Sequence, residues 1–171
     1  MLFSQESVIK LFTEHIEVKS GSKCLHTDVF RQLIKSDEDL HRVVEKYAGT
    51  IRKRFNVYAG ANIDMECRDD ASVDLMELEM LFKDFGVNCP NVTKRAVFGL
   101  FTMSRDENLL EDSYALRYAS FLELLLRVAC LKYGGPDCAM GQTPVHDPDK
   151  PCTPLHECAA QLFDIICAKK R

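Results

Sequence analysis

The sequence has no strong surplus of charge of either sign. Lysine and arginine number 22 and aspartate and glutamate 26, so the formal net charge is −4 over 171 residues. A broad nucleic-acid interface needs a concentrated positive surface, and the one dense basic run here is Arg52, Lys53 and Arg54. These cations lie near the end of a predicted helix, where they complement the helix dipole. A solvated helix end is therefore favoured over an anionic partner, and we expect no nucleic-acid partner.

Long apolar runs are missing as well. No stretch approaches the roughly 20 apolar residues that a membrane helix needs. The N-terminal segment MLFSQESVIK lacks the basic region and apolar core of a secretory leader. We therefore expect an intracellular, cytoplasmic or cytoskeletal protein with no membrane partner, whose eight cysteines are reduced.

Sequence motifs of common catalytic and metal sites are also absent. No P-loop, dinucleotide-binding glycine pattern, HExxH or GxSxG segment occurs. Cys138, His146, Cys152, His156 and Cys158 gather in one stretch, but without the CxxC spacing of zinc modules. A surface loop is favoured there over a zinc site. It is also favoured over a Cys–His nucleophile, because no glycine turn suited to an oxyanion site accompanies these residues. We expect no catalytic residue and no enzymatic activity.

What the sequence does contain is helical periodicity. Apolar residues at spacings of three and four predict about seven helices. The predicted helices cover 5–18, a short segment after Thr27, 38–57, 74–85, 92–103, 120–133 and 155–168. Thr27 and Ser36 are the predicted N-caps of the second and third helices. Gly86 is the predicted C-cap of the fourth, and Thr153 with Pro154 opens the last.

The pattern divides the chain into three parts. Residues 1–133 are predicted to form one helical domain. Residues 134–154 hold most of the prolines and no periodicity, so we interpret them as an irregular connector. Residues 155–171 form a C-terminal amphipathic helix, and its apolar face consists of Leu155, Ala159, Leu162, Phe163 and Ile166.

Two segments resemble each other and a known motif. Residues 72–86 read SVDLMELEMLFKDFG and residues 115–129 read ALRYASFLELLLRVA. With the proline-containing linker between them, residues 72–130 resemble a calmodulin-type EF-hand pair, and the best match extends over 38–133. The resemblance implies an all-α fold of helix–loop–helix pairs, in which Val73 and Leu116 form a short β bridge between the hands. The closing phrase YASFLELLLRVACLKYG also resembles divergent EF-hand proteins of protist cilia and flagella.

The calcium ligands that the resemblance implies are mostly lost. An EF-hand loop supplies carboxylate and carbonyl oxygens at fixed positions and ends on a bidentate glutamate. Alignment on Val73 places Glu66, Asp70, Asp74 and Glu77 at ligand positions of the first loop. Arg68 also falls at a ligand position, where its charge repels a cation. In the second loop Ser120 stands in place of the glutamate. We expect both loops to be empty, and the alternative is a calcium sensor that uses the 64–77 loop.

An open EF-hand pair exposes a groove that accepts an amphipathic helix. The candidate groove residues are Met76, Met80, Phe82, Phe85, Phe101, Met103, Phe121 and Leu125. The plainer interpretation is that the methionines fill gaps in the core. If the groove exists, docking of the chain's own 155–168 helix is favoured over an outside partner.

These observations predict a non-catalytic adaptor or structural protein that binds other proteins without calcium or another cofactor. The ciliary resemblance implies a location in the axoneme or microtubule cytoskeleton of a cilium or flagellum. It also implies tubulin or axonemal proteins as partners.

Overall fold

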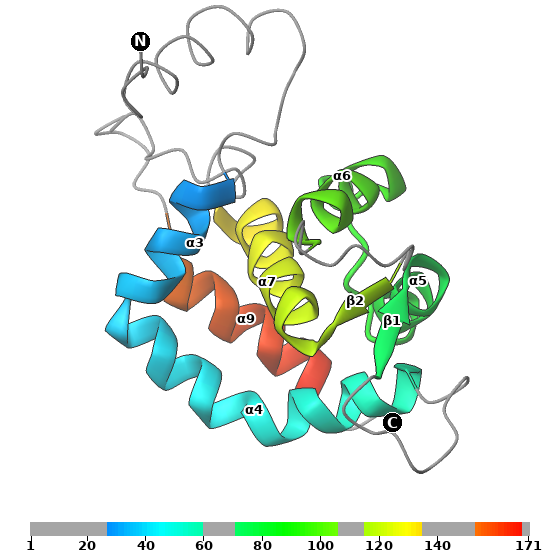
Figure 1. The fold of residues 1–171 in the computed structure, drawn as a ribbon, viewed down its shortest axis with the longest axis horizontal. Helices are drawn as coiled ribbons and strands as arrows, with labels where there is room; N and C mark the ends of the chain where they lie inside the picture. The colour runs from blue at the N-terminus through cyan, green and yellow to red at the C-terminus, as the bar shows by residue number, and fades with distance from the viewer. Residues whose placement is uncertain (1–26, 60–70, 106–114, 135–152, 169–171) are drawn as a thin grey trace, which may run out of the picture.

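The computed structural model describes residues 27–59, 71–105, 115–134 and 153–168. These ranges are mostly helical and contain one two-stranded sheet (Figure 1). The elements are α3 (Thr27–Ser36), α4 (Glu38–Ala59), β1 (Ser72–Asp74), α5 (Leu75–Asp84), α6 (Lys94–Ser104), β2 (Ala115–Arg117), α7 (Tyr118–Ala129), the π-helical turn η5 (Cys130–Gly134) and α9 (Leu155–Cys167). The predicted helix at 5–18 and nearly all of the predicted connector lie outside the described residues.

The two strands pair antiparallel, as predicted. Val73 faces Leu116, and their neighbours pair as Ser72 with Arg117 and Asp74 with Ala115. Val73 and Leu116 are both buried. Each strand leads directly into a helix, β1 into α5 and β2 into α7, so the sheet holds the first turns of these two helices side by side (Figure 1).

Helix α4 carries the predicted apolar stripe, but its cap differs from the prediction. Leu40, Ile51 and Phe55 are buried along one face. The backbone N–H of Leu40 donates to Asp37 Oδ1 at 2.9 Å, so Asp37 is the cap. The hydroxyl of Ser36 donates back to the Leu33 carbonyl at 3.2 Å, because Ser36 still belongs to α3.

Two other predicted caps are corrected in the same way. Helix α3 begins at Thr27 itself, so Thr27 does not precede the helix. Helix α9 has Pro154 at its N-cap position and no side-chain hydrogen bond there. The Pro154 carbonyl accepts the N–H groups of Glu157 and Cys158 at 3.1 and 3.0 Å. Thr153 therefore does not cap the helix.

The C-terminus of α5 closes on Gly86, as predicted. Gly86 has φ 65°, in the left-handed region. Its N–H donates to the Lys83 carbonyl at 3.3 Å, and the Val87 N–H donates to the Phe82 carbonyl at 2.8 Å. These two bonds form a Schellman motif. Val87 is fully buried, so the turn directs the chain back onto the core before α6.

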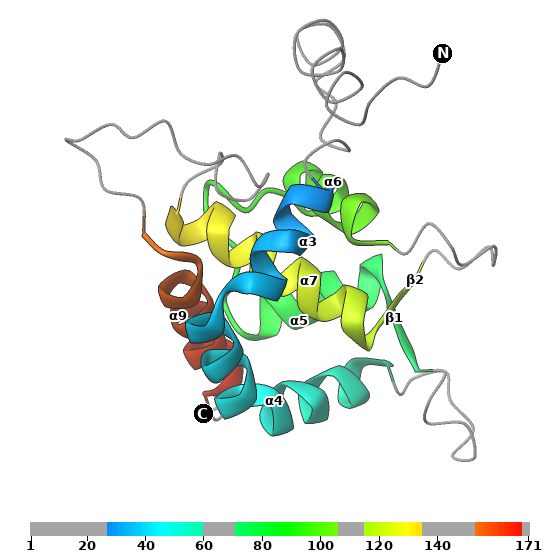
Figure 2. The ribbon, with the colours of Figure 1, turned by 60° about the vertical axis from the view of Figure 1, so that its left-hand side comes forward.

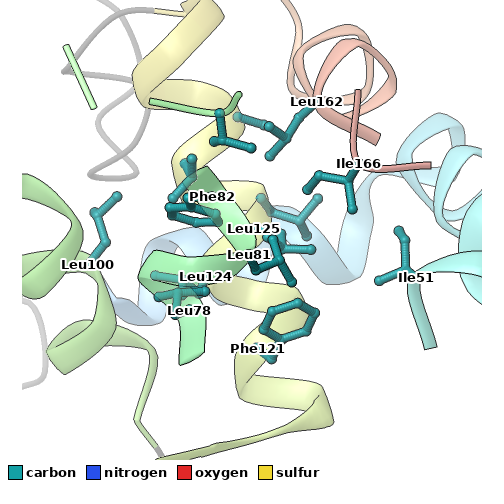
Figure 3. Packing of buried hydrophobic residues seen from close by; sticks show 14 of the residues in the cluster. Ile51, Leu78, Leu81, Phe82, Leu100, Phe121, Leu124, Leu125, Leu162 and Ile166 are labelled. Carbon is teal, nitrogen blue, oxygen red and sulfur yellow. The ribbon is translucent and has the colours of Figure 1, made fainter. Parts of the chain in front are cut away.

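Helix α7 lies at the centre of the described residues, and every side chain from Leu124 to Ala129 is buried. Helices α6 and α9 pack against it, and α4 reaches it through the ring of Phe55, 5.2 Å from that of Phe121. In Figure 3 the labelled side chains of α4, α5, α6, α7 and α9 belong to one cluster of buried residues.

Two glycines give a matched test of the backbone. We expect Gly86→Ala to lower the free energy of unfolding by about 1 kcal/mol, because a side chain is strained at positive φ. Gly49→Ala is the control. Gly49 lies within α4, where an added Cβ meets nothing within 4 Å, so alanine should raise stability by about 0.5–1 kcal/mol. Urea unfolding of the full chain measures both changes, and equal signs would contradict the assignment.

Candidate functional site

The two described calcium-ligand candidates bond to each other. Asp74 Oδ1 accepts the Glu77 N–H at 2.8 Å, and Glu77 Oε2 accepts the Asp74 N–H at 2.9 Å. This reciprocal capping box closes the first turn of α5. A cation that took the Glu77 carboxylate would break one of these bonds. Glu66 and Asp70, the other two candidates, lie outside the described residues.

The eight predicted groove residues do not share one surface. Phe82, Phe101, Met103, Phe121 and Leu125 are buried in the core. Phe85 is half-buried. Met76 and Met80 alone are strongly exposed, at 75% and 59%. The expectation of one groove formed by these eight residues is corrected, because the five buried side chains belong to the core cluster. Core packing, the plainer interpretation, fits Met103 but not the two methionines of α5.

Helix α9 packs on α4, α7 and η5 (Figure 2). Its predicted apolar face is buried: Ala159, Leu162, Phe163 and Ile166 are 0% exposed and Leu155 is 8% exposed. Polar contacts join the edges of this face. The hydroxyl of Tyr47 donates to Asp164 Oδ1 at 2.5 Å. Arg54 Nη2 donates to the Ala168 carbonyl at 3.2 Å, at the C-terminal end of α9, where a cation also complements the helix dipole.

The basic run therefore does more than face solvent. Arg54 lies with its guanidinium 4.7 Å from the Phe85 ring centroid and joins α4 to the end of α9. Arg52 lies 4.2 Å from the Tyr118 ring centroid. Both are cation–π distances. Lys53 remains exposed.

Sequence reasoning missed a buried charge in α7. Arg127 is fully buried and donates from Nη2 and Nε to Glu123 Oε1 at 2.7 and 3.0 Å. Arg31 Nε of α3 donates to the other oxygen, Glu123 Oε2, at 2.9 Å. The Phe30 ring centroid lies 4.3 Å from the Arg127 guanidinium. Burial lowers the pKa of Arg127, and its bond to Glu123 opposes that shift. The spacing of four between Glu123 and Arg127 on an apolar helix was the available signal.

An open hollow lies between α5 and α6 and has a volume of about 540 Å³. Its apolar lining consists of Met76, Met80, Phe82, Val92 and Val97. Its polar lining consists of Glu79, Lys83, Asn88 and Lys94. Met76, Met80 and Phe82 were predicted groove residues. The contributions of the linker and α6 were missed, because helix periodicity does not show how far two neighbouring helices stand apart.

The proposed zinc and thiol residues are only partly described. Cys138, His146 and Cys152 lie outside the described residues. Cys158 is buried and its thiol donates to the Thr153 carbonyl at 3.5 Å. His156 Nδ1 lies 4.0 Å from Asp37 Oδ2. Within the described ranges, no group of three His, Cys, Asp or Glu residues could hold a metal ion.

Comparison with protein-family models, curated proteins and solved structures finds no match for this chain. None of the described helices combines the length and apolarity that crossing a membrane requires.

The docking of α9 predicts a large effect at one of its positions. Phe163→Ala should lower the free energy of unfolding by about 3–5 kcal/mol, because it empties a fully buried site beside Tyr47. Gln161→Ala is the control on the exposed face of the same helix and should change stability by less than about 0.5 kcal/mol. Urea unfolding of the full chain compares them, and equal effects would show that α9 is not held in solution.

Removal of Glu123 and removal of Arg127 should lower the free energy of unfolding by different amounts. Glu123→Ala should cost about 3–5 kcal/mol of stability, because it leaves the buried Arg127 charge uncompensated. Arg127→Met should cost at least about 1 kcal/mol less than Glu123→Ala, because Glu123 keeps Arg31 as its partner. Unfolding of both variants at one pH measures the difference. The reverse order would mean that Arg31 does not compensate the Glu123 carboxylate in solution.

Proposed function

We propose that this protein is a calcium-independent adaptor that binds other proteins and catalyses no reaction. The observation that carries the proposal is the state of Glu77. The carboxylate that an EF-hand loop would turn toward calcium instead accepts the Asp74 N–H. The helices that an ion would orient are held by the β1–β2 pairing and by apolar packing.

Two further observations support a binding role over a catalytic one. Burial is the largest cause of the shifted pKa values of Tyr118, Arg127, Tyr133 and Cys167, as expected of packed side chains rather than of an activated nucleophile and its base. Cys167 is an example: burial raises the pKa of its thiol, so it is less reactive than an exposed cysteine. The exposed apolar side chains Met76, Met80 and Phe98 instead suit contact with another protein.

A place in the axoneme or microtubule cytoskeleton of a cilium or flagellum is part of the proposal. Its support is the resemblance of residues 118–134 to divergent ciliary EF-hand proteins. The antiparallel pairing of Val73 with Leu116 supports the calmodulin-type resemblance, which is separate from the ciliary one. Tubulin and axonemal proteins are the proposed partners.

Calcium titration of the full chain tests the first half of the proposal. A site with a Kd on the order of 10 µM would stabilise the protein by about 2.7 kcal/mol in 1 mM calcium and raise Tm by several degrees. We expect neither heat in calorimetry nor a change in Tm, with magnesium as the control. A calcium-specific rise in Tm that Glu77→Gln removes would show that the chain is a sensor using the 64–77 loop.

Co-sedimentation with isolated axonemes tests the second half. We expect the full chain to pellet with axonemes equally in chelator and in calcium, and not to pellet alone. Failure to pellet in either condition would contradict the axonemal assignment. Binding in calcium alone would contradict calcium independence.

A further inference from the structure

The hollow between α5 and α6 is separate from the surface that α9 covers. Helix α9 packs on α4, α7 and η5, whereas the hollow is lined by α5, α6 and the linker between them. Figures 1 and 2 show α6 and α9 on different sides of α7. The docked C-terminal helix therefore leaves this second apolar surface uncovered.

The hollow has an apolar strip along α5. Met76 and Met80 lie one helical turn apart, so their side chains share a face, and they are 75% and 59% exposed. Val92 and Val97 face them from the linker and α6, and both are buried. Flexible methionines beside rigid valines form a surface that adapts to an apolar side chain.

The rim of this hollow is positive. Lys94 Nζ donates to Glu79 Oε2 at 2.8 Å, so these two charges compensate each other. Lys83, exposed on the last turn of α5, makes no ion pair with the residues that the structure describes. Lys83 therefore stands beside the apolar strip as a cation without an ion pair among the described residues, and it favours an acidic group on whatever binds there.

We propose that this hollow binds an acidic amphipathic helix of a partner protein. The partner helix places two large apolar side chains, one turn apart, against Met76 and Met80, and a carboxylate near Lys83. The inference rests on the proposed adaptor function and names the surface and the partner chemistry for it.

The dimensions fit about three turns of helix. Helix α5 has 10 residues and α6 has 11, so each is roughly 15–16 Å long at 1.5 Å per residue. A contact of that length is small among protein interfaces. We therefore expect a Kd on the order of 10–100 µM, which suits one weak contact among several.

A second copy of the chain fits less well. In a two-fold dimer through this surface, identical residues come close to their own copies. Lys83 of each chain would then lie near a second Lys83, and like charges that face each other disfavour the contact.

The probe is a library of displayed peptides on a fixed three-turn helical scaffold. The library randomises the apolar positions on one face of this scaffold. It also randomises the flanking positions, which can be acidic, basic or neutral. Selection on the full chain, with counter-selection on Met80→Glu, should enrich two apolar residues one turn apart with acidic flanks. Nuclear magnetic resonance of ¹³C-methyl methionine then maps the selected peptide, which should shift the Met76 and Met80 signals and leave Met103 unchanged.

Two charge variants test the rim. Lys83→Glu should weaken binding of the acidic peptide about fivefold or more at low salt, and high salt should reduce the difference. Lys53→Glu is the control, an exposed lysine on α4, and should leave the affinity unchanged. Thermal unfolding checks that Met80→Glu, at an exposed position, remains folded.

Several results would overturn the proposal. They are failure to enrich any peptide, enrichment of basic flanks, and an equal effect of the two lysine variants. Methionine shifts that depend on protein concentration alone would identify a second copy as the occupant. Shifts of Met76 and Met80 on deletion of residues 1–24 would identify the chain's own N-terminal segment. If axonemes still bind the full chain after any of these results, only the assignment of the binding surface is wrong. If the peptide binds and axonemes do not, only the proposed axonemal role is wrong.

Discussion

No side chain of α7 from Leu124 to Ala129 is exposed to water, and the other described elements are arranged around that constraint. Leu124, Leu125 and Val128 are fully buried, and each contributes roughly 1.5–3 kcal/mol once it leaves water. One neighbour cannot cover all sides of such a helix. Helices α6 and α9 pack on it directly, α4 reaches it through Phe55, and α3 contributes Phe30 over the buried Arg127. The C-terminal helix is therefore part of the core.

Local contacts also fix the positions of the two helices that follow the strands. The pairing of Val73 with Leu116 fixes the start of α5 relative to α7. The capping box of Asp74 and Glu77 closes the first turn of α5, and the turn at Gly86 returns the chain to the core through Val87. Each device uses backbone groups and near neighbours in sequence. A bound cation would duplicate what they already do.

The parts of the fold that local pattern determines could be predicted from the sequence. The stripe of α4, the face of α9, the glycine at 86 and the strand pairing follow from periodicity, turn chemistry and the internal resemblance. The predicted N-cap of α4 was wrong because two polar residues, Ser36 and Asp37, stand together there, and both can accept a backbone N–H. The prediction of a single groove was wrong for a different reason. An apolar position such as Phe121 or Leu125 shows that a side chain is covered, but not which helix covers it. The shared use of Glu123 by Arg127 and Arg31 was missed because Arg31 lies 92 residues from Glu123 in the sequence.

Exposure of single apolar side chains is common on monomeric proteins, so Met76 and Met80 would carry little meaning by themselves. Their setting is different. They lie one turn apart beside a hollow whose other wall is formed by valines, and the nearest basic rim residue lacks an ion pair among the described residues. Helix α9 does not cover this surface, and contact with a partner is the role that we propose for it.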